Sequence, residues 1–435
     1  MTDSESAIAV AGRPGATGRS RLWKTLGPGL ITGAADDDPS GIATYAQAGT
    51  QFGLGVAWTL VLTYPLMVAI QAICARIGRT TGHGIAGNLR KYYPNWILQS
   101  IVALLFTANV LNLGADLGAM AESTRLLIPV PAWMAVLVFG AITIWGQVVF
   151  KHTRYVAVLK WLTLSLFAYF GTLVTVRIPW GELVRGLLWP QLSLNRDFWL
   201  MGVAVLGTTI SPYLFFWQAA QEVEDTKARP SREPLLRAPG QAPQAIARIR
   251  ADTLVGMAFS NLVGLAILVT SAVTLHAHGL KDVGTAAQAA EALRPVAGTW
   301  AFMLFALGIV GTGLLSVPVL ATSAAYALGE ARRWPVGLSK SPHRARAFYG
   351  AIVLSTGLGA IGNLLKVSPI KALVWAAVIN GVVAVPVMVM VVLLGTRADV
   401  MGEFRISKRL RVAGWCATAI MAGASLVFLG SVLWK

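Results

Sequence analysis

Charged residues are scarce in this chain of 435 residues. Asp, Glu, Lys and Arg make up 13% of the sequence, about half of their share in a typical soluble domain, whereas 55% of the residues are hydrophobic. The charges also cluster in short segments between apolar runs. Each run reaches the roughly 20 helical residues that cross a hydrocarbon core of about 30 Å. The composition therefore excludes an ordinary soluble protein and predicts a membrane protein.

Short segments of alternating hydrophobicity, the pattern of a transmembrane β-barrel, are missing. The apolar runs are instead continuous and rich in Leu, Val, Ala and Gly. Helices and closed barrels are the two structures that satisfy all backbone hydrogen bonds in lipid. We therefore predict an all-α polytopic membrane protein.

Cysteine and catalytic motifs are also rare. The two cysteines, Cys74 and Cys416, fall in predicted spans, so we interpret them as small apolar residues rather than as a disulfide or a metal site. We find no His-Glu-x-x-His motif and no phosphate-binding loop, so nothing indicates an enzyme or a cofactor. The net charge of +17 does not indicate a nucleic-acid partner, because the basic residues are shared among alternate loops instead of gathering in one domain.

About eleven apolar runs are long enough to be membrane spans. They cover residues 26–52, 55–77, 98–124, 131–150, 154–176, 197–222, 252–276, 298–327, 346–364, 368–395 and 412–434. Most of the 36 Lys and Arg residues share one side of the membrane if the N-terminus is cytoplasmic. The positive-inside rule then predicts a multi-pass protein of the inner membrane with a cytoplasmic N-terminus and a periplasmic or extracellular C-terminus.

The segments between the spans are too short to form domains of their own. We expect residues 1–20 to be a disordered cytoplasmic N-terminus and residues 21–435 to be a single transmembrane transporter domain. Residues 223–251 are rich in Pro and Arg, which predicts a flexible cytoplasmic linker between the sixth and seventh spans. The sequence does not indicate an oligomeric state.

The first predicted span is interrupted by three consecutive acidic residues, Asp36, Asp37 and Asp38. A carboxylate that faces lipid costs about 3 kcal/mol even on the most lenient insertion scale. Pro39 removes a backbone donor and Gly41 permits non-helical dihedral angles, so the helix can break and turn its polar groups toward a cavity. A solvated helix cap at the membrane edge is the alternative, but apolar sequence continues on both sides of the break.

The sixth predicted span contains a matching interruption. Pro212 lies in its middle and is preceded by the hydroxyl residues Thr208, Thr209 and Ser211. Interrupted helices at corresponding positions of two five-helix halves are the best sequence indication of a transport site at the membrane midplane. The third span adds a buried acid, Asp116, which we interpret as functional unless it pairs with an in-span cation such as Lys160.

At these positions the sequence resembles the Nramp family of divalent-metal transporters, which have the LeuT-type fold. The resembling segments are Leu26-Gly-Pro-Gly-Leu-Ile, Asp38-Pro-Ser-Gly, Gln47-Ala-Gly, Thr81-Gly-His-Gly and Asn112-Leu-Gly-Ala-Asp116. The resemblance implies a 5+5 inverted repeat with discontinuous helices 1 and 6. It also implies secondary active import of divalent metal cations, with Asp38 as a metal ligand and Asp116 on a proton pathway.

The chain departs from the family pattern in its polar positions. Gly41 stands where the family has a metal-binding Asn, and Ser211 and Tyr213 stand where it has Met and His. Gln218 replaces a second histidine, and Ala119 replaces an acidic residue one turn after the third-helix aspartate. Because both histidines that handle protons are missing, coupling to protons stays open.

The remaining candidate ligands are all oxygen donors. They are Asp38, Asp37, Ser211, Asn380 and the carbonyl groups of Ala35 and Thr208. Such a set suits a hard ion such as Mg²⁺ or Mn²⁺ better than a soft one. An alternative on the same fold is a symporter of an amino acid or another small organic cation or zwitterion, since the acidic break disfavours anions. A membrane sensor without transport is a third reading, although no soluble effector domain accompanies it.

Overall fold

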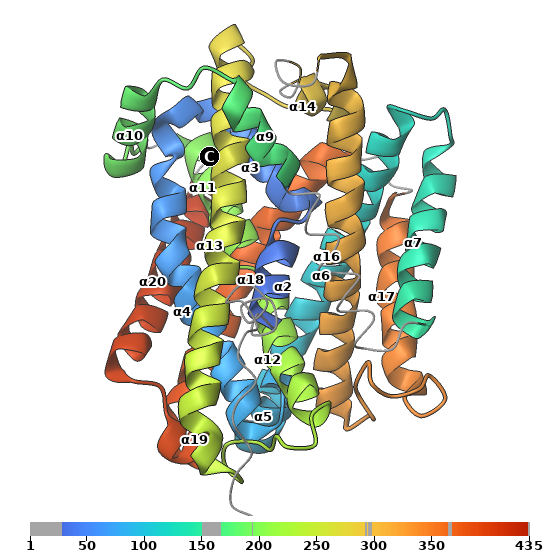
Figure 1. The fold of residues 1–435 in the computed structure, drawn as a ribbon, viewed down its shortest axis with the longest axis vertical. Helices are drawn as coiled ribbons and strands as arrows, with labels where there is room; N and C mark the ends of the chain where they lie inside the picture. The colour runs from blue at the N-terminus through green and yellow to red at the C-terminus, as the bar shows by residue number, and fades with distance from the viewer. Residues whose placement is uncertain are drawn as a thin grey trace, which may run out of the picture.

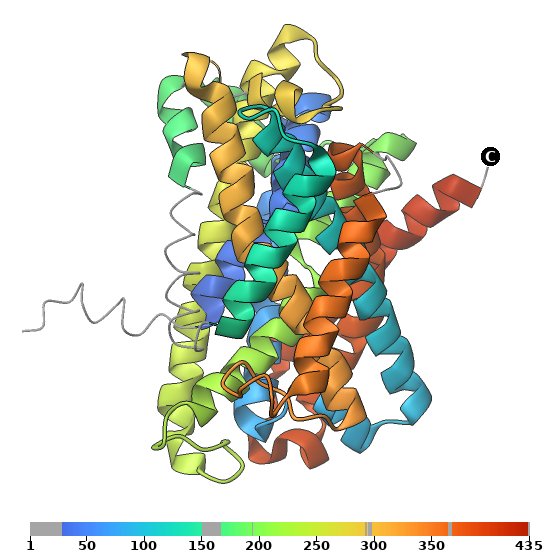
Figure 2. The same ribbon diagram turned by 90° about the vertical axis from the view of Figure 1, so that its right-hand side faces the viewer.

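The computed structural model describes residues 28–149, 167–193, 195–291, 294, 298–363 and 368–433. The described residues form helices and no strands, and the long helices run side by side along one axis of a single bundle (Figure 1, Figure 2). The expected disordered segment 1–20 and Lys160 lie outside the described residues. The all-α architecture predicted from the continuous apolar runs is confirmed.

The principal helices follow the predicted order. They are α2 (Pro28–Asp36), α3 (Pro39–Phe52), α4 (Trp58–Thr81), α5 (Ile85–Tyr92), α6 (Asn95–Arg125), α7 (Ala132–Val149), α9 (Phe167–Thr175), α10 (Trp180–Leu188), α11 (Arg196–Thr209), α12 (Pro212–Lys227), α13 (Ala242–Thr274), α14 (Ala286–Glu291), α16 (Ala301–Arg332), α17 (Arg346–Gly362), α18 (Pro369–Thr396), α19 (Ala398–Met401) and α20 (Lys408–Leu433).

Eight helical stretches of the described chain are long and apolar enough to cross a membrane, and the protein is therefore a multi-pass membrane protein. This criterion of length and hydropathy finds fewer membrane spans than the eleven predicted. The first span is divided between α2 and α3, α17 has 17 residues, and the predicted span 154–176 is only partly described. The number of spans stays a prediction.

Both predicted interruptions are present. The chain leaves the helix at Asp36 and re-enters it at Pro39, and it leaves again at Thr209 and re-enters at Pro212. In both cases proline occupies the first helical position. A backbone N–H at that position has no partner within the helix, so the missing N–H of proline costs no hydrogen bond. The two breaks therefore follow from local chemistry that the sequence displays.

The broken first span lies in the interior of the bundle, where α13 packs along both of its halves (Figure 1). The approach is very close: a Cβ atom on Gly33 would lie 2.1 Å from the carbonyl oxygen of Gly256. The Asp252 carboxylate of α13 accepts hydrogen bonds from the backbone N–H groups of Gly29 (2.8 Å) and Leu30 (3.2 Å). These contacts fix the position of α2, the first half of the span, along the axis of α13.

The connection between α12 and α13 is shorter than the predicted linker 223–251. Helix α12 continues to Lys227 and α13 begins at Ala242, so only residues 228–241 lie between the two helices. Part of this connection is tied to the end of α4, because the N–H of Leu235 donates to the carbonyl of Arg79 at 3.2 Å. Its Leu235 side chain is buried in a small apolar cluster with Ala242 and Ala245.

Candidate metal site

Asp38 lies between α2 and α3 and is 2% exposed. Its Oδ1 atom caps α3, accepting hydrogen bonds from the Ser40 hydroxyl and from the Gly41 N–H, both at 2.7 Å. Its Oδ2 atom accepts a hydrogen bond from the Asn112 side chain of α6 at 3.0 Å, and the Tyr213 hydroxyl of α12 lies 3.4 Å away. One carboxylate therefore joins both broken helices to the third span.

Gly41 leaves room for a group of oxygen atoms at the break. A Cβ atom at this position would lie 3.2 Å from the carbonyl oxygen of Asp36, 3.2 Å from the Thr208 hydroxyl and 3.5 Å from Oδ1 of Asp38. The Thr208 hydroxyl is buried and has no hydrogen-bond partner among the residues that the structure describes. Oxygen donors from both broken helices thus converge on the glycine that replaces the family's asparagine.

Two backbone carbonyls predicted as ligands already accept hydrogen bonds within the protein. The Ala35 carbonyl accepts one from the Tyr213 hydroxyl at 2.9 Å. The Thr208 carbonyl accepts one from the Ser211 hydroxyl at 2.8 Å, and the same hydroxyl also reaches the Gly207 carbonyl at 2.8 Å. In this conformation Ser211 therefore supports the backbone of its own helix.

Asp36 and Asp37 face α13 through their carboxylates. The Ser260 hydroxyl lies 2.7 Å from Oδ2 of Asp36 and 3.4 Å from Oδ1 of Asp37. Among the described residues, no three His, Cys, Asp or Glu side chains are grouped so that they could hold a metal ion. The structure therefore does not bring the predicted ligand Asp37 into contact with the partners of Asp38.

Asp116 lies one helical turn from Asn112 on the same face of α6. Its Oδ2 atom accepts a hydrogen bond from the Ser316 hydroxyl of α16 at 3.1 Å, and the backbone of Ser40 also faces it. Its Oδ1 atom is buried, and no described residue forms a hydrogen bond with it. Asp116 and Asp38 are thus neighbours, because both contact Ser40 at the start of α3. The sequence alone did not indicate this proximity.

Asn380 is fully buried on α18, and neither its amide nitrogen nor its oxygen has a hydrogen-bond partner in the described part of the chain. Helix α18 approaches α11 closely, because a Cβ atom on Gly207 would lie 2.1 Å from the Ala377 carbonyl and 2.4 Å from the Gly381 N–H nitrogen. Asn380 therefore lies beside the turn that carries Thr208, but no hydrogen bond joins it to Asp38.

The site lacks a protein cation. Asp36, Asp37, Asp38 and Asp116 form no ion pair with any Lys, Arg or His in the part of the chain that the structure describes. Buried carboxylates without a cationic partner are costly in a membrane span unless a proton or a metal ion neutralises them. The arrangement is suited to bind a cation through oxygen atoms.

Two contributors to the site were not predicted in their roles. Asn112 was noted only as part of a family-like segment. The Thr208 hydroxyl was noted at the break, but only the Thr208 carbonyl was named as a candidate ligand. The role of Asn112 could have been found from its spacing. Asn112 lies four residues before Asp116, which places both side chains on one helical face.

Comparison with known proteins identifies the family of this chain. Residues 29–431 match the family described as Nramp, natural resistance-associated macrophage protein-like. The chain is 28% identical over 434 residues to a protein of Ralstonia nicotianae named divalent metal cation transporter MntH, covering 95% of this chain and 92% of the relative. A protein of the same name from Deinococcus radiodurans is 25% identical over 447 residues, covering 100% and 94% of the two chains.

Solved structures show the same fold. A manganese transporter of Eremococcus coleocola superposes with a TM-score of 0.74 at 18% identity, covering 97% of this chain and 89% of that one. Mhp1, a nucleobase-cation-symport-1 family transporter, superposes with a TM-score of 0.53 at 15% identity, covering 94% and 92%. The predicted LeuT-type inverted repeat with discontinuous helices 1 and 6 is confirmed, and the protein is not an enzyme. The chain belongs to the Nramp family.

Proposed function

We propose that this protein is a secondary transporter that imports divalent metal cations, with Asp38 as the central ligand. The observation that carries the proposal is the position of this carboxylate, buried where both broken helices meet and without a cationic partner among the described residues. Proteins named divalent metal cation transporters align with almost the whole chain, which supports the same cargo. The organic-solute alternative has no comparable support.

The donor set favours a hard ion. Oxygen atoms of Asp38, Thr208 and the Asp36 backbone surround Gly41. The Asn112 side chain, which donates to Asp38, also carries an amide oxygen without a hydrogen-bond partner among the described residues. Sulfur is not among these donors, and hard oxygen ligands suit Mg²⁺ or Mn²⁺. We propose that Ala35, Ser211 and Asn380 complete the shell when the helices shift, because each lies at or beside a break.

Transport would proceed by alternating access around this fixed site. In transporters of this architecture one group of helices rocks against the other, while the unwound segments retain the substrate. We propose Asp116 as the proton acceptor, because it is buried next to Ser40 and lacks a partner for one oxygen. The N-terminus would be cytoplasmic in the inner membrane, in keeping with the distribution of basic residues.

Metal uptake into proteoliposomes tests the proposal directly. Asp38→Ala should abolish Mn²⁺ and Mg²⁺ uptake, because it removes the only carboxylate that contacts both broken helices among the described residues. Asp399→Ala is the matched control, since Asp399 is an exposed carboxylate paired with Arg397. Unchanged uptake by the Asp38 variant would refute the site, and uptake of an amino acid but of no metal would refute the cargo.

Calorimetry on the purified protein separates the candidate ions. Binding of Mg²⁺ and Mn²⁺ with similar affinity is expected from a shell that contains only oxygen atoms. Tight Mn²⁺ binding without any Mg²⁺ binding would contradict the hard-ion assignment.

A further inference from the structure

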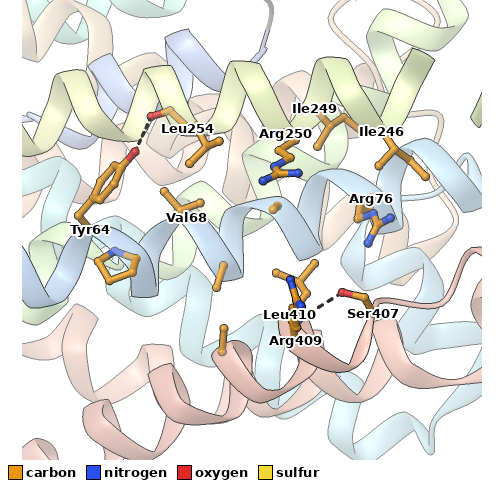
Figure 3. A pocket seen from close by; sticks show the side chains of 14 residues that line it. Tyr64, Val68, Arg76, Ile246, Ile249, Arg250, Leu254, Ser407, Arg409 and Leu410 are labelled. Atoms are coloured by element: carbon orange, nitrogen blue, oxygen red, sulfur yellow. Dashed lines mark hydrogen bonds between the residues drawn. The ribbon is translucent and has the colours of Figure 1, made fainter. Parts of the chain in front are cut away.

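A groove of about 620 Å³ lies on the side of the bundle, between α4, α13 and α20. Figure 3 shows α4 between the other two helices, with side chains from all three directed toward the space over it. The groove lies toward the end of the bundle where α4 ends and α20 begins. It is separate from the metal site, because none of its lining residues belongs to α2, α3, α11 or α12.

Three arginines line this groove, one from each helix: Arg76 of α4, Arg250 of α13 and Arg409 of α20. Arg250 and Arg409 point toward α4 from its two sides, and Arg76 lies on α4 itself (Figure 3). Arg76 is partly buried, whereas the other two are exposed. No Asp or Glu lines the groove, so three positive charges converge on one space without a lining carboxylate.

Other arginines at the same end of the bundle are paired. Arg248 forms an ion pair with Glu222, and Arg232 forms one with Asp225. Arg79 donates to the backbone of Glu233 and to the side chain of Gln241. The side chains of the three groove arginines form no hydrogen bond or ion pair with any residue that the structure describes. Their convergence is therefore not a consequence of a network within the protein.

The rest of the groove is apolar apart from Ser407 and the hydroxyl group of Tyr64. Its wall beyond the arginines is formed by Tyr64, Pro65, Val68 and Leu254. The Tyr64 hydroxyl is already engaged, since it donates to the Leu254 carbonyl at 3.3 Å (Figure 3). This wall therefore offers hydrocarbon contact and requires no further hydrogen bond from an occupant.

We propose that this groove binds an anionic phospholipid of the surrounding membrane. The phosphate lies between Arg76, Arg250 and Arg409, and an acyl chain runs along the wall formed by Tyr64, Pro65, Val68 and Leu254. Guanidinium groups match phosphate geometry through paired N–H donors, and basic pockets between membrane helices are known to bind anionic lipid head groups. A free phosphate ion would use the arginines but leave the apolar wall without a function.

The position in the membrane agrees with this occupant. Under the orientation proposed above, the end of the bundle that carries the arginines is cytoplasmic, where anionic lipids attract basic side chains. Long arginine side chains can hold their charge at the head-group level while their stems contact apolar surface. The binding itself does not depend on metal transport, so it can be tested on the protein without any transport assay.

Native mass spectrometry of the detergent-purified full-length protein is the direct test. Titration with phosphatidylglycerol and, separately, with phosphatidylcholine of the same chain length should give a bound lipid for the first and much weaker binding for the second. A variant with Arg76→Gln, Arg250→Gln and Arg409→Gln should bind phosphatidylglycerol on the order of 100-fold more weakly, since each basic residue near a membrane surface contributes about fivefold.

The matched control carries the same loss of charge elsewhere. It removes three exposed arginines outside the groove, where α16 ends, α17 begins and a loop joins them: Arg332→Gln, Arg344→Gln and Arg346→Gln. This variant should retain the binding of the parent protein. The single variant Arg409→Gln, at an exposed position at the start of α20, should show a loss of about fivefold and guards against misfolding of the triple variant.

Three outcomes would overturn the proposal. They are equal binding of phosphatidylglycerol and phosphatidylcholine, equal losses in the groove variant and the control variant, and displacement of the lipid by inorganic phosphate, which would assign the arginines to a soluble anion. Selective binding that disappears only in the groove variants would establish the lipid site.

Discussion

The Tyr213 hydroxyl donates a hydrogen bond of 2.9 Å to the carbonyl oxygen of Ala35. This contact joins the second half of the broken sixth span, α12, to the end of α2, and the same hydroxyl lies 3.4 Å from Oδ2 of Asp38. The positive end of an O–H bond is thus directed at oxygen atoms that we propose as metal ligands. Under this proposal, Tyr213 competes with the metal for the Ala35 carbonyl in the present conformation.

Tyr213→Phe should therefore increase metal affinity. The substitution frees the Ala35 carbonyl, and a hydrogen bond of this kind is worth about 1 kcal/mol net, which corresponds to about fivefold in the dissociation constant. Calorimetry with Mn²⁺ measures the change. Tyr349→Phe removes a comparable hydroxyl-to-carbonyl hydrogen bond, made to Lys340, and should leave affinity unchanged. Weaker binding by Tyr213→Phe would instead identify the hydroxyl as a ligand.

Gly41→Ala should weaken metal binding and slow uptake. The added methyl group lies about 3.2 Å from two oxygen atoms of the site, which is closer than ordinary van der Waals contact, so those oxygens must move away from their present positions. Gly202→Ala on α11 is the control, because nothing lies within 4 Å of a Cβ atom there. Equal behaviour of the two variants in Mn²⁺ uptake would show that the space around Gly41 does not hold the ion.

Asp116→Asn should separate metal binding from proton movement. The variant keeps the size of the side chain and its contact with Ser316, but it removes the group that can take up a proton. Metal binding should persist, while metal-dependent proton uptake, followed with a pH-sensitive dye inside proteoliposomes, should disappear. Asp197→Asn, at an exposed carboxylate of α11, should leave proton uptake intact. Persistent proton uptake in the Asp116 variant would place the proton pathway elsewhere.

Asp252→Ala should destabilise the folded protein. It leaves the N–H groups of Gly29 and Leu30 at the start of α2 without their acceptor, at a cost of about 2 kcal/mol. Thermal unfolding in detergent, measured by the loss of monodisperse protein, should show a lower midpoint than for the parent. Glu403→Ala, at an exposed carboxylate, should not change the midpoint. An unchanged midpoint for the Asp252 variant would mean that the cap contributes nothing to stability.

Both helix breaks could be predicted from sequence because their causes are local. Proline cannot donate to the helical ladder, and three adjacent acids cannot continue an apolar helix, so the chain must leave the helix near Asp36 and near Pro212. Most of the long apolar runs likewise predicted the described helices within about five residues, but α13 begins at Ala242, ten residues before the predicted start of the seventh span.

The partners within the site could not be predicted in the same way. Asp36, Asp37 and Asp38 are adjacent in sequence, yet the first two face Ser260 and the third faces Asn112. The direction of each side chain depends on how the backbone unwinds and on which helix packs beside it. Neither is visible in a local window of sequence.

The sequence by itself determined that the chain is helical, crosses a membrane repeatedly and breaks two of its spans, because hydropathy and proline act over a few residues. Only the tertiary structure decided which oxygens surround Gly41, that Tyr213 reaches the Ala35 carbonyl, and that Arg76, Arg250 and Arg409 share one groove. Most of those contacts join residues that lie more than a hundred positions apart, and their geometry is set by the close packing of helices against one another.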